Sequence, residues 1–565
     1  MADRTNELDG GEAVLEAFRR LGTDYIVSSP GSEWGPLWEA LARQRIGDKK
    51  GPAFLETWHE NLAVNIATGY TLMTGRGQAV LLHAGVGLLH GAMGILTAQQ
   101  GEVPMVVMSG ESVSLGENPD MPIEPQWYGG LSVGGPERLI EPLVKHARQI
   151  ASPFTIHDSI IRAGEMAERT PRGPVYLSIS LEDMLHGWTP PQDARRVPPP
   201  PKVAPHPDEV AKIAALIRAA KNPVIVAEAA GRDSAAYAAL VTLAEQLGAP
   251  VIGGINMWFT NFPTDHKLWL GAGEYGALPE ADLVLLVGPR APWYPAYRRP
   301  TKGPIVAIHD NPHKTHMVYQ NLHADHYLEG DIASALNMLS AALPKGGDAA
   351  HAARRDRWHQ AHEAYVATRA AEQAAARARP GIDPVTLAAM LGDALPADAI
   401  VVDETITHHP IVRRHLNFTR PQSYFRVFGG LGQGMGTALG VKLASRDRPV
   451  VLTAGDGGFL YNPIVQALGA AKQHGLPILI AVFNNGRYQA MKQGHVFHYP
   501  KGASVEADLF YGVHLDAPDF ADFARPFGAW GGKADTPAEL AKALPEALAA
   551  TRAGRAAILN VAVTS

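Results

Sequence analysis

Residues 450–488 read VVLTAGDGGFLYNPIVQALGAAKQHGLPILIAVFNNGRY, and the pattern of this stretch indicates the fold class. An apolar run at 450–453 and a second at 478–483 are separated by a segment of helix length. This pattern predicts a β-α-β unit with parallel strands. Polar clusters follow the two runs, at 455–458 and 484–486. Parallel sheets bind their ligands at the carboxyl ends of the strands, which is where both clusters fall.

The residues of these two clusters suit a metal ion and a phosphate. Asp456 and Asn485 offer the hard oxygen ligands that Mg²⁺ or Ca²⁺ prefers. Gly455, Gly457 and Gly458 would let backbone amides approach an anion at the start of the next helix. One cation beside a phosphate cradle predicts a phosphorylated cofactor. The alternative is a glycine-rich turn in an ordinary α/β domain.

Composition excludes several classes of protein. The chain has 565 residues, of which 46% are hydrophobic and 19% charged, with a net charge of −6 and no cysteine. Disulfides, thiolate metal sites and a cysteine nucleophile are therefore excluded, and nothing predicts nucleic acid or an anionic membrane as a partner. Residues 77–101 lack Asp, Glu, Lys and Arg, but their glycines, histidines and glutamines favour a buried strand and helix over a membrane span. The first 13 residues show no apolar leader, so we expect a soluble, cytoplasmic protein.

Alternation of strand-like and helix-like segments predicts an α/β fold with three doubly wound parallel-sheet domains. The expected domains are 1–188, 206–345 and 381–565. A proline-rich joint at 189–207 separates the first two, and a helical connector at 346–380 separates the last two. Strands are expected at 24–28, 78–82, 104–109, 172–180, 222–227, 248–252, 281–288, 304–308 and 557–563.

A second motif lies in the first domain, where Glu60 begins a predicted helix over residues 60–74. It reads His-Glu-x-x-Ala-x-x-x-Ala-x-Gly-Tyr. A glutamate in a first helical turn can simply complement the helix dipole. Together with the glycine-rich clusters, however, this segment resembles the one that carries the activating glutamate of thiamine diphosphate enzymes. A third motif, VFGGLGQGMG at 427–436, resembles the turn that meets the cofactor's aminopyrimidine.

The chain therefore resembles the pyruvate decarboxylase/acetolactate synthase superfamily over essentially its whole length. The resemblance implies that Asp456, the Asn485 side chain and the Arg487 carbonyl hold Mg²⁺. It implies that Glu60 hydrogen-bonds the aminopyrimidine N1′ and so helps the cofactor to lose its C2 proton. It also implies a homodimer or homotetramer with active sites at the dimer interface.

The same resemblance assigns further residues to the cofactor. Gly429 and Leu431 would meet the aminopyrimidine, and Leu431 would hold the cofactor bent, while Met435 is expected to pack in the core. The remaining residues assigned to the diphosphate end are Gly455, Gly457, Gly458, Thr405, Thr407, His408 and Tyr488.

Two short segments resemble benzoylformate decarboxylases in particular. Ser32 stands in a Pro-Gly-Ser turn that resembles their carboxylate-binding turn, and His83 stands in a Leu-His segment that resembles their proton-transfer histidine. The alternatives are that Ser32 caps a helix and that His83 is structural. No histidine is evident in the middle-domain stretch 288–299, where a second catalytic one would be expected.

His409 is a candidate to face the substrate. His90 and His408 are further candidates for proton transfer. Arg487, Tyr488 and His495 could contact an acceptor or acyl group. The aromatic residues that could shape a pocket are Trp34, Trp58, Trp293, Tyr294 and Tyr488.

The implied activity is cleavage of a carbon–carbon bond next to a carbonyl. The leading hypothesis is non-oxidative decarboxylation of a 2-oxo acid to an aldehyde through an enamine. The alternative is a carboligase that makes 2-hydroxyketones or acetohydroxy acids, or a lyase for 2-hydroxyacyl thioesters or diketones. A flavin-linked oxidase would need FAD in the middle domain, and no fingerprint in the sequence supports FAD there.

Overall fold

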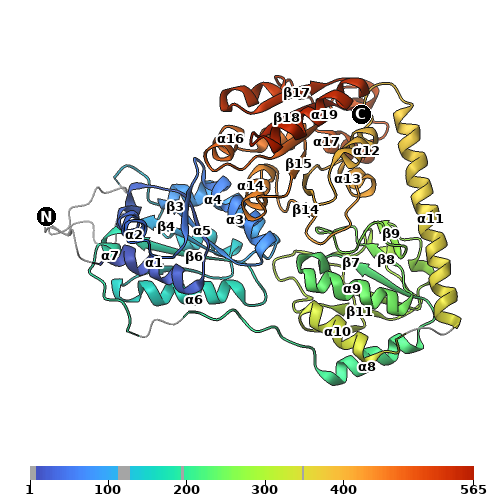
Figure 1. Cartoon of the computed structure of the whole chain (residues 1–565), viewed down its shortest axis with the longest axis horizontal. Coiled ribbons are helices and arrows are strands. Elements are labelled where there is room, and N and C mark those ends of the chain that lie inside the picture. Colours follow the sequence, from blue (N-terminus) through green and yellow to red (C-terminus); the bar gives the residue numbers. More distant parts are fainter. Residues whose placement is uncertain (1–7, 112–127, 193–195, 346–348, 565) are drawn as a thin grey trace. The chain divides into compact units, whose positions relative to one another are not determined.

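The computed structural model describes residues 8–111, 128–192, 196–345 and 349–564. Its named strands form three six-stranded sheets, and the neighbouring strands within each sheet pair in parallel (Figure 1). Helices flank each sheet, because a parallel strand can return to its sheet only through a crossover connection. The predicted fold class, α/β with three doubly wound parallel sheets, is confirmed.

The first sheet has the strand order β2-β1-β3-β4-β6-β5. Its strands are β1 (Tyr25–Ser29), β2 (Ala53–Glu56), β3 (Gln78–His83), β4 (Met105–Glu111), β5 (Ala147–Ile150) and β6 (Pro174–Ser180). Its helices are α1 (Gly10–Leu21), α2 (Gly35–Ile46), α3 (Glu60–Thr74), α4 (Ala84–Gln100), α5 (Pro136–Ile140), α6 (Ile156–Glu168) and α7 (Leu181–Met184). Strands β4 and β6 are buried along their whole length, as expected when helices cover both faces.

The second sheet has the order β12-β11-β10-β7-β8-β9. Its strands are β7 (Pro223–Ala227), β8 (Val251–Gly253), β9 (Trp269–Ala272), β10 (Leu283–Val287), β11 (Ile305–Ile308) and β12 (His326–Leu328). Its helices are α8 (Pro207–Ala219), α9 (Ser234–Leu247) and α10 (Ile332–Ala342). A core of aliphatic side chains from β7, β10 and β11 fills the space between this sheet and its helices.

The third sheet has the order β14-β13-β15-β16-β18-β17, the same relative order as the first. Its strands are β13 (Ile400–Glu404), β14 (Tyr424–Arg426), β15 (Val450–Gly455), β16 (Leu479–Asn484), β17 (Trp530–Ala534) and β18 (Ala557–Ala562). The helices of this region are α12 (Pro384–Ala394), α13 (His409–His415), α14 (Gly434–Ala444), α15 (Asp456–Tyr461), α16 (Ile464–Gln473), α17 (Gln489–His498), α18 (Ala503–Glu506) and α19 (Pro537–Arg552). The predicted β-α-β unit of residues 450–488 is therefore present as β15, two helices and β16.

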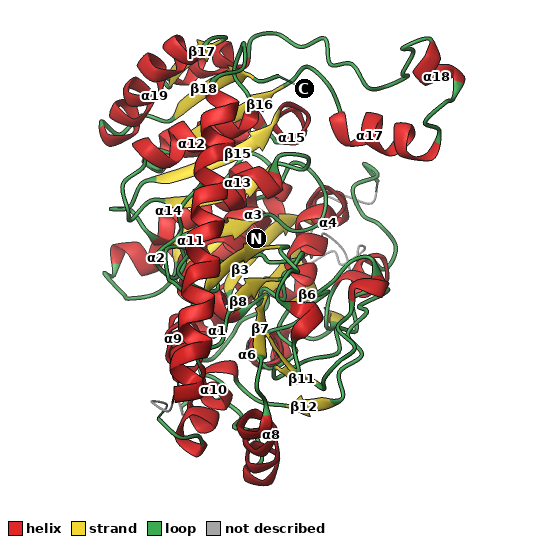
Figure 2. Ribbon diagram, turned by 90° about the vertical axis from the view of Figure 1, so that its right-hand side faces the viewer, coloured by secondary structure: helices red, strands yellow, loops and turns green. Residues whose placement is uncertain are grey.

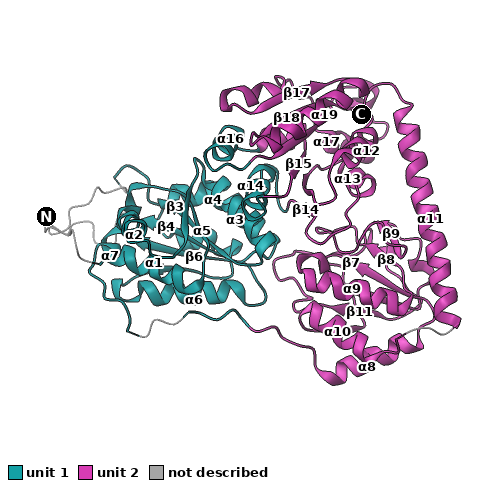
Figure 3. Ribbon diagram, in the orientation of Figure 1, with its two compact units in different colours: residues 1–200, 428–446, 462–476 teal, residues 201–427, 447–461, 477–565 magenta. Residues whose placement is uncertain are grey.

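Helix α11 (Ala349–Arg377) is 29 residues long and lies within the segment for which a helical connector is predicted (Figure 2). Only Trp358, His362 and Ala376 are buried along it. No helix in the described ranges is both long and apolar enough to cross a membrane. The exact domain limits remain a prediction, because the chain clusters by contacts into two compact units rather than three (Figure 3).

One compact unit comprises residues 1–200, 428–446 and 462–476, and the other comprises residues 201–427, 447–461 and 477–565. The first unit thus includes α14 and α16 beside the first sheet. Within it, α3 and α14 approach so closely that a side chain on Gly69 would lie 2.0 Å from the Thr437 carbonyl oxygen. A side chain on Gly440 would likewise lie 2.0 Å from the Ile66 carbonyl oxygen. Both glycines are therefore needed for this helix contact.

Candidate active site

The candidate residues fall into two groups, one in each compact unit. In the first unit, Glu60 is the first residue of α3, as predicted. His59 is the N-cap, and its Nδ1 accepts a hydrogen bond from the backbone amide of Asn61 at 3.1 Å. Burial lowers the pKa of His59, which keeps the imidazole neutral and able to accept this bond.

The glycines of α4 leave room for the Glu60 side chain. A side chain on Gly87 would lie 3.2 Å from Glu60 Oε1 and 3.4 Å from the Cβ of His83. A side chain on Gly91 would lie 3.7 Å from the Cβ of Glu60. Glu60 and His83 therefore both lie next to Gly87 of α4.

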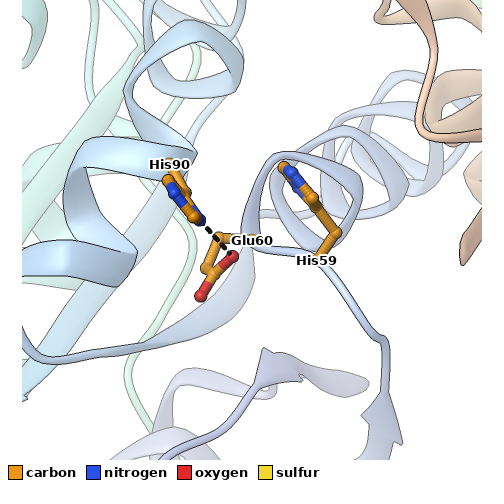
Figure 4. A group of neighbouring side chains, drawn as sticks. All are labelled: His59, Glu60 and His90. Atoms are coloured by element: carbon orange, nitrogen blue, oxygen red, sulfur yellow. Dashed lines mark hydrogen bonds and ion pairs between the residues drawn. The ribbon is translucent and has the colours of Figure 1, made fainter.

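A second histidine contacts Glu60 from α4. His90 Nδ1 lies 3.3 Å from Glu60 Oε2, and the dashed line in Figure 4 marks this contact. The rings of His59 and His90 are nearly parallel, with centroids 5.6 Å apart. His90 is exposed, whereas the Glu60 side chain is 14% exposed. Glu60 is thus flanked by two imidazoles and keeps one carboxyl oxygen, Oε1, on the side of Gly87.

His83 is held by a carboxylate that the sequence did not single out. His83 ends β3, and its Nδ1 lies 2.8 Å from Oε2 of Glu33, whose side chain has no exposed surface. Glu33 Oε1 accepts a hydrogen bond from the Ala84 amide at 3.2 Å. The hydrogen bond to Glu33 raises the pKa of His83 above its usual value, although burial opposes it.

Glycines and backbone strain position this pair. A side chain on Gly31 would lie 1.7 Å from His83 Nδ1, and one on Gly110 would lie 2.2 Å from the Glu33 Cγ. Ala84 adopts the left-handed region, with φ of 45°, at the junction of β3 and α4. Such a conformation costs free energy in a residue with a side chain and occurs where a site must be held in one shape.

A third acidic group, Glu111, ends β4 near the same pair. Burial raises the pKa of Glu111 to about 7, and the negative charge of Glu33 adds to this. The Ser109 hydroxyl donates to Glu111 Oε1 at 3.3 Å, and Ser109 Oγ lies 2.6 Å from the Tyr176 hydroxyl. His83 is therefore surrounded by acidic groups, which favour its protonated form.

Ser32 begins a short 3₁₀ turn (Ser32–Trp34) and is exposed. No side-chain hydrogen bond caps this turn, and the N-cap of α2 is Trp34, so the alternative that Ser32 serves as a helix cap is not supported. Ser32 directly precedes Glu33 in the chain.

The glycine-rich turn that contains Leu431 lies against α3 and α4 in this unit. Gly429 has φ of 71°, and a side chain there would lie 2.9 Å from Thr97 Oγ1. The Thr97 hydroxyl donates to the Phe428 carbonyl at 3.3 Å. Leu431 is half-buried, and Met435 is 1% exposed, which confirms its expected place in the core.

Two asparagines of α3 hold the other end of this turn. Asn61 Nδ2 donates to the Gly432 carbonyl at 3.5 Å, and Asn65 Nδ2 donates to Gln433 Oε1 at 2.6 Å. Asn61 follows Glu60 directly, so the predicted activating glutamate and the predicted aminopyrimidine turn are neighbours.

In the second unit, Asp456 follows β15 as the first residue of α15. Its Oδ1 accepts from the Gly457 amide at 2.8 Å, and its Oδ2 accepts from the amides of Asn485 and Arg487, each at 3.1 Å. Asn485 Oδ1 accepts from the same Arg487 amide at 3.2 Å. Asp456 Oδ2 and Asn485 Oδ1 therefore meet at the Arg487 amide, and both are hard oxygens of the kind that suits a divalent cation.

Burial raises the pKa of Asp456, and backbone hydrogen bonds offset only part of this effect. A cation at this point would stabilise the carboxylate. The fit of the loop is tight, because a side chain on Gly457 would lie 2.4 Å from the Tyr488 ring. Gly458 approaches the Glu404 carbonyl, whereas a side chain on Gly455 would meet nothing within 4 Å. The residues present thus fit a metal-bound diphosphate.

The loop after β13 is organised by Asp403, which the sequence did not single out. Its Oδ1 accepts from the Thr405 amide, the Thr405 hydroxyl and the Thr453 hydroxyl at 2.9, 2.6 and 3.0 Å. Its Oδ2 lies 2.9 Å from the Tyr424 hydroxyl and 3.0 Å from His409 Nδ1. Burial would raise the pKa of Asp403, but the hydrogen bond with His409 leads the contacts that hold it below its usual value.

His409, predicted to face the substrate, is only 4% exposed. Burial lowers its pKa to about 4, so its imidazole is neutral and Nδ1 donates to Asp403. Its Nε2 is buried and has no hydrogen-bond partner among the described residues. This arrangement suits a residue that holds the loop more than one that meets a substrate.

The residues assigned to the diphosphate share this loop. The Thr405 hydroxyl donates its hydrogen to Asp403, so it is left only as an acceptor. Thr407 is half-buried, and His408 is buried against Phe483 with ring centroids 5.5 Å apart. Burial lowers the pKa of His408. Of these three side chains, Thr407 is the most open to a ligand.

Two of the aromatic residues that could shape a pocket, Trp34 and Trp293, do not line one. Trp34 is fully buried and donates from Nε1 to the Leu82 carbonyl at 3.0 Å, and Trp293 is 1% exposed. Both belong to cores, because a large ring excludes water best where it is enclosed. Trp58 and Tyr294 are exposed, at 56% and 69%. His495 is exposed on α17 and packs against the rings of Tyr499 and Phe510.

Three family models match the chain, in the order of its three sheets. They are the N-terminal TPP binding domain, the central domain and the C-terminal TPP binding domain of thiamine pyrophosphate enzymes, at residues 8–122, 210–339 and 405–561. Together they cover most of the chain. The protein therefore belongs to the thiamine pyrophosphate enzyme family, and its cofactor is thiamine diphosphate.

Relatives and solved structures match this chain over nearly its whole length. The acetolactate synthase large subunit of Haemophilus influenzae is 26% identical, over 96% of this chain and 92% of that protein. The benzoylformate decarboxylase of Pseudomonas aeruginosa is 27% identical over 96% of both. The crystal structure of a benzoylformate decarboxylase from Polynucleobacter necessarius has the same fold, with a TM-score of 0.79 over 98% of each chain at 23% identity. The chain is thus an enzyme of the group that contains thiamine-diphosphate-dependent decarboxylases and carboligases.

Proposed function

We propose that the protein catalyses the non-oxidative decarboxylation of a 2-oxo acid, releasing CO₂ and an aldehyde. The observation that carries this proposal is the pair of His83 and Glu33 beside Glu60. Replacing the carboxylate of a 2-oxo acid by hydrogen consumes one proton, which a group in the site must supply. We assign this task to His83, because its hydrogen bond to Glu33 raises its pKa and so favours the protonated ring.

The residues of the second unit would hold the cofactor's charged end. Asp456, the Asn485 side chain and the Arg487 carbonyl are the proposed ligands of Mg²⁺. The backbone around Gly457 and Gly458, together with Thr407 and Tyr488, would contact the diphosphate. Bound thiamine diphosphate supplies the carbanion-stabilising centre that lets the bond to the carboxyl carbon break.

The residues of the first unit would orient the cofactor and the substrate and would supply the proton that the aldehyde needs. Glu60 would hydrogen-bond the aminopyrimidine through Oε1, the oxygen that faces Gly87. His83 would give its proton from Nε2, because Nδ1 is bound to Glu33. Ser32, which is exposed, would bind the substrate carboxylate.

We further propose that the protein works in the cytoplasm as a homodimer or homotetramer in which the two groups of residues meet at subunit interfaces. The resemblance to the family supports this assembly. Light scattering after size exclusion measures it, and a monomer that is fully active would contradict it.

The test is to supply purified protein with Mg²⁺ and thiamine diphosphate and to offer a panel of 2-oxo acids. CO₂, aldehyde and hydroxyketone are quantified in each reaction. Aldehyde formed in step with CO₂ is the expected result and identifies the preferred side chain. Hydroxyketone in place of aldehyde would instead assign a carboligase, which the acetolactate synthase relative makes the second candidate. Absence of CO₂ from every acid, with cofactor bound, would reject the proposal and direct the search to thioesters and diketones.

A further inference from the structure

The central sheet has the strand order of a dinucleotide-binding fold. Read from β9, its order is β9-β8-β7-β10-β11-β12. The strands β8 and β9 therefore lie on one side of β7, and β10, β11 and β12 lie on its other side. In such sheets a ligand binds at the carboxyl ends of the two strands where the direction reverses. Here those strands are β7 and β10. The phosphate of a nucleotide would be held by backbone amides of the loops that follow them.

In this chain a carboxylate occupies that point. Glu228 follows β7 directly and has no exposed surface. Its Oε2 accepts from the amides of Arg290 and Ala291, after β10, at 2.6 and 3.0 Å. Its Oε1 accepts from the amide of Asn256, after β8, at 3.2 Å. Three backbone donors from two loops thus converge on one anion of the chain itself.

The fit around this carboxylate leaves no room for a second anion. A side chain on Gly254 would lie 2.3 Å from Glu228 Oε1. The Arg290 guanidinium stacks on Trp258, 3.5 Å from the ring centroid, and its charge helps to stabilise the carboxylate. Burial raises the pKa of Glu228, and the backbone hydrogen bonds offset part of that cost. The three backbone amides therefore already donate their hydrogen bonds to a carboxylate of the protein itself.

The second position that a nucleotide phosphate could take is also filled. Helix α9 follows β7 and begins at Ser234, with Asp233 as its N-cap. Asp233 Oδ1 accepts from the Ala235 amide at 2.8 Å, and Oδ2 pairs with Lys202 at 2.9 Å. The N-terminus of the helix is thus already neutralised by a carboxylate.

We propose that Glu228 is a built-in anion that replaces a nucleotide phosphate at the switch point of the central sheet. The central domain then orders its loops without a flavin or an adenine nucleotide. This inference does not depend on which reaction the enzyme performs, and it argues against a flavin-linked oxidase.

The test compares wild-type protein with Glu228→Ala and with Glu209→Ala, which changes a half-exposed glutamate of α8 in the same domain, as the matched control. Binding of FAD and of ADP is measured by calorimetry. Thermal unfolding is followed in inorganic phosphate and in sodium chloride of equal ionic strength. We expect no nucleotide binding by the wild type. We expect Glu228→Ala to unfold at a lower temperature, and phosphate to raise that temperature by a few degrees more than chloride does.

Phosphate stabilises folded proteins in general, so the control and the wild type should show the same, smaller gain in phosphate over chloride. Stoichiometric binding of FAD or ADP to the wild type would overturn the proposal, and so would a Glu228→Ala protein that phosphate stabilises no more than it stabilises the wild type. If Glu228→Ala does not fold, the measurement of FAD and ADP binding to the wild type still tests the proposal, because this measurement uses no variant.

Discussion

His83 Nδ1 lies 2.8 Å from Oε2 of Glu33, a carboxylate that is entirely enclosed. The two residues are 50 positions apart: Glu33 lies in the 3₁₀ turn after β1, and His83 ends β3, the neighbouring strand of the sheet. Because a buried carboxylate is costly unless it is paired, Glu33 and a protonated His83 stabilise each other. The pair therefore sets the pH range in which His83 can give up a proton.

Glu33→Gln should shift the alkaline limb of the rate profile to lower pH. The hydrogen bond to Glu33 raises the pKa of His83, so its proton is lost only as pH rises through that raised value. Without the carboxylate, His83 loses its proton at lower pH. The measurement is kcat/KM against pH, with Glu39→Gln, on the exposed side of α2, as control. An unchanged alkaline limb would show that His83 is not the proton donor.

Glu60→Gln should leave thiamine diphosphate bound but lower kcat by about a hundredfold or more, as expected when a positioned acid–base group is lost. Gln keeps the shape of the side chain and removes its ability to exchange a proton. Cofactor binding is measured by calorimetry and turnover by release of CO₂. Wild-type turnover in this variant would remove the role proposed for Glu60.

Asp456→Asn should weaken binding of thiamine diphosphate in the presence of Mg²⁺ by about tenfold or more. The variant loses the charge that would balance the cation while keeping one oxygen for the loop amides. Chelation of divalent ions should weaken binding to the wild type and have little further effect on the variant. Equal affinities for the two proteins would place the metal elsewhere.

Gly69→Ala should destabilise the contact between α3 and α14 by about 1–3 kcal/mol or more, because the new methyl group meets backbone rather than a movable side chain. Gly35→Ala is the matched control, since a side chain there meets nothing within 4 Å. Chemical denaturation measures both. Equal stability of the two variants would mean that α3 and α14 are not packed this closely in solution.

Acid should destabilise the protein through histidines that are buried in the neutral form. Burial lowers the pKa of His409 and of His415 to about 4. The unfolded chain takes up these protons first, so stability is present above the ordinary histidine pKa and is lost as pH falls towards 4. His409→Asn should lose less stability between neutral pH and pH near 5 than the wild type does. A parallel loss in both, measured by thermal unfolding, would exclude His409 as a cause.

Local patterns in the sequence determined a large part of this protein. The apolar runs located strands in all three sheets to within one or two residues, except β8, which begins at Val251, three residues after its expected start at 248. Glu60 lies at the start of α3, and Asp456 and Asn485 lie at adjacent strand ends, as predicted. These features depend on neighbours along the chain, namely periodicity, glycine-rich turns and helix starts, so the sequence alone carries them.

Only the tertiary structure decided which distant groups meet. Glu33 with His83, Asp403 with His409 and Tyr424, and Glu228 with the loops after β8 and β10 each depend on which strand ends are adjacent. Burial likewise decided that Trp34 and Trp293 belong to cores rather than to a pocket. A carboxylate looks the same in a sequence whether it meets water, a histidine or three backbone amides. Strand order and burial determine which of these partners it has, and they follow from the packing of the whole chain.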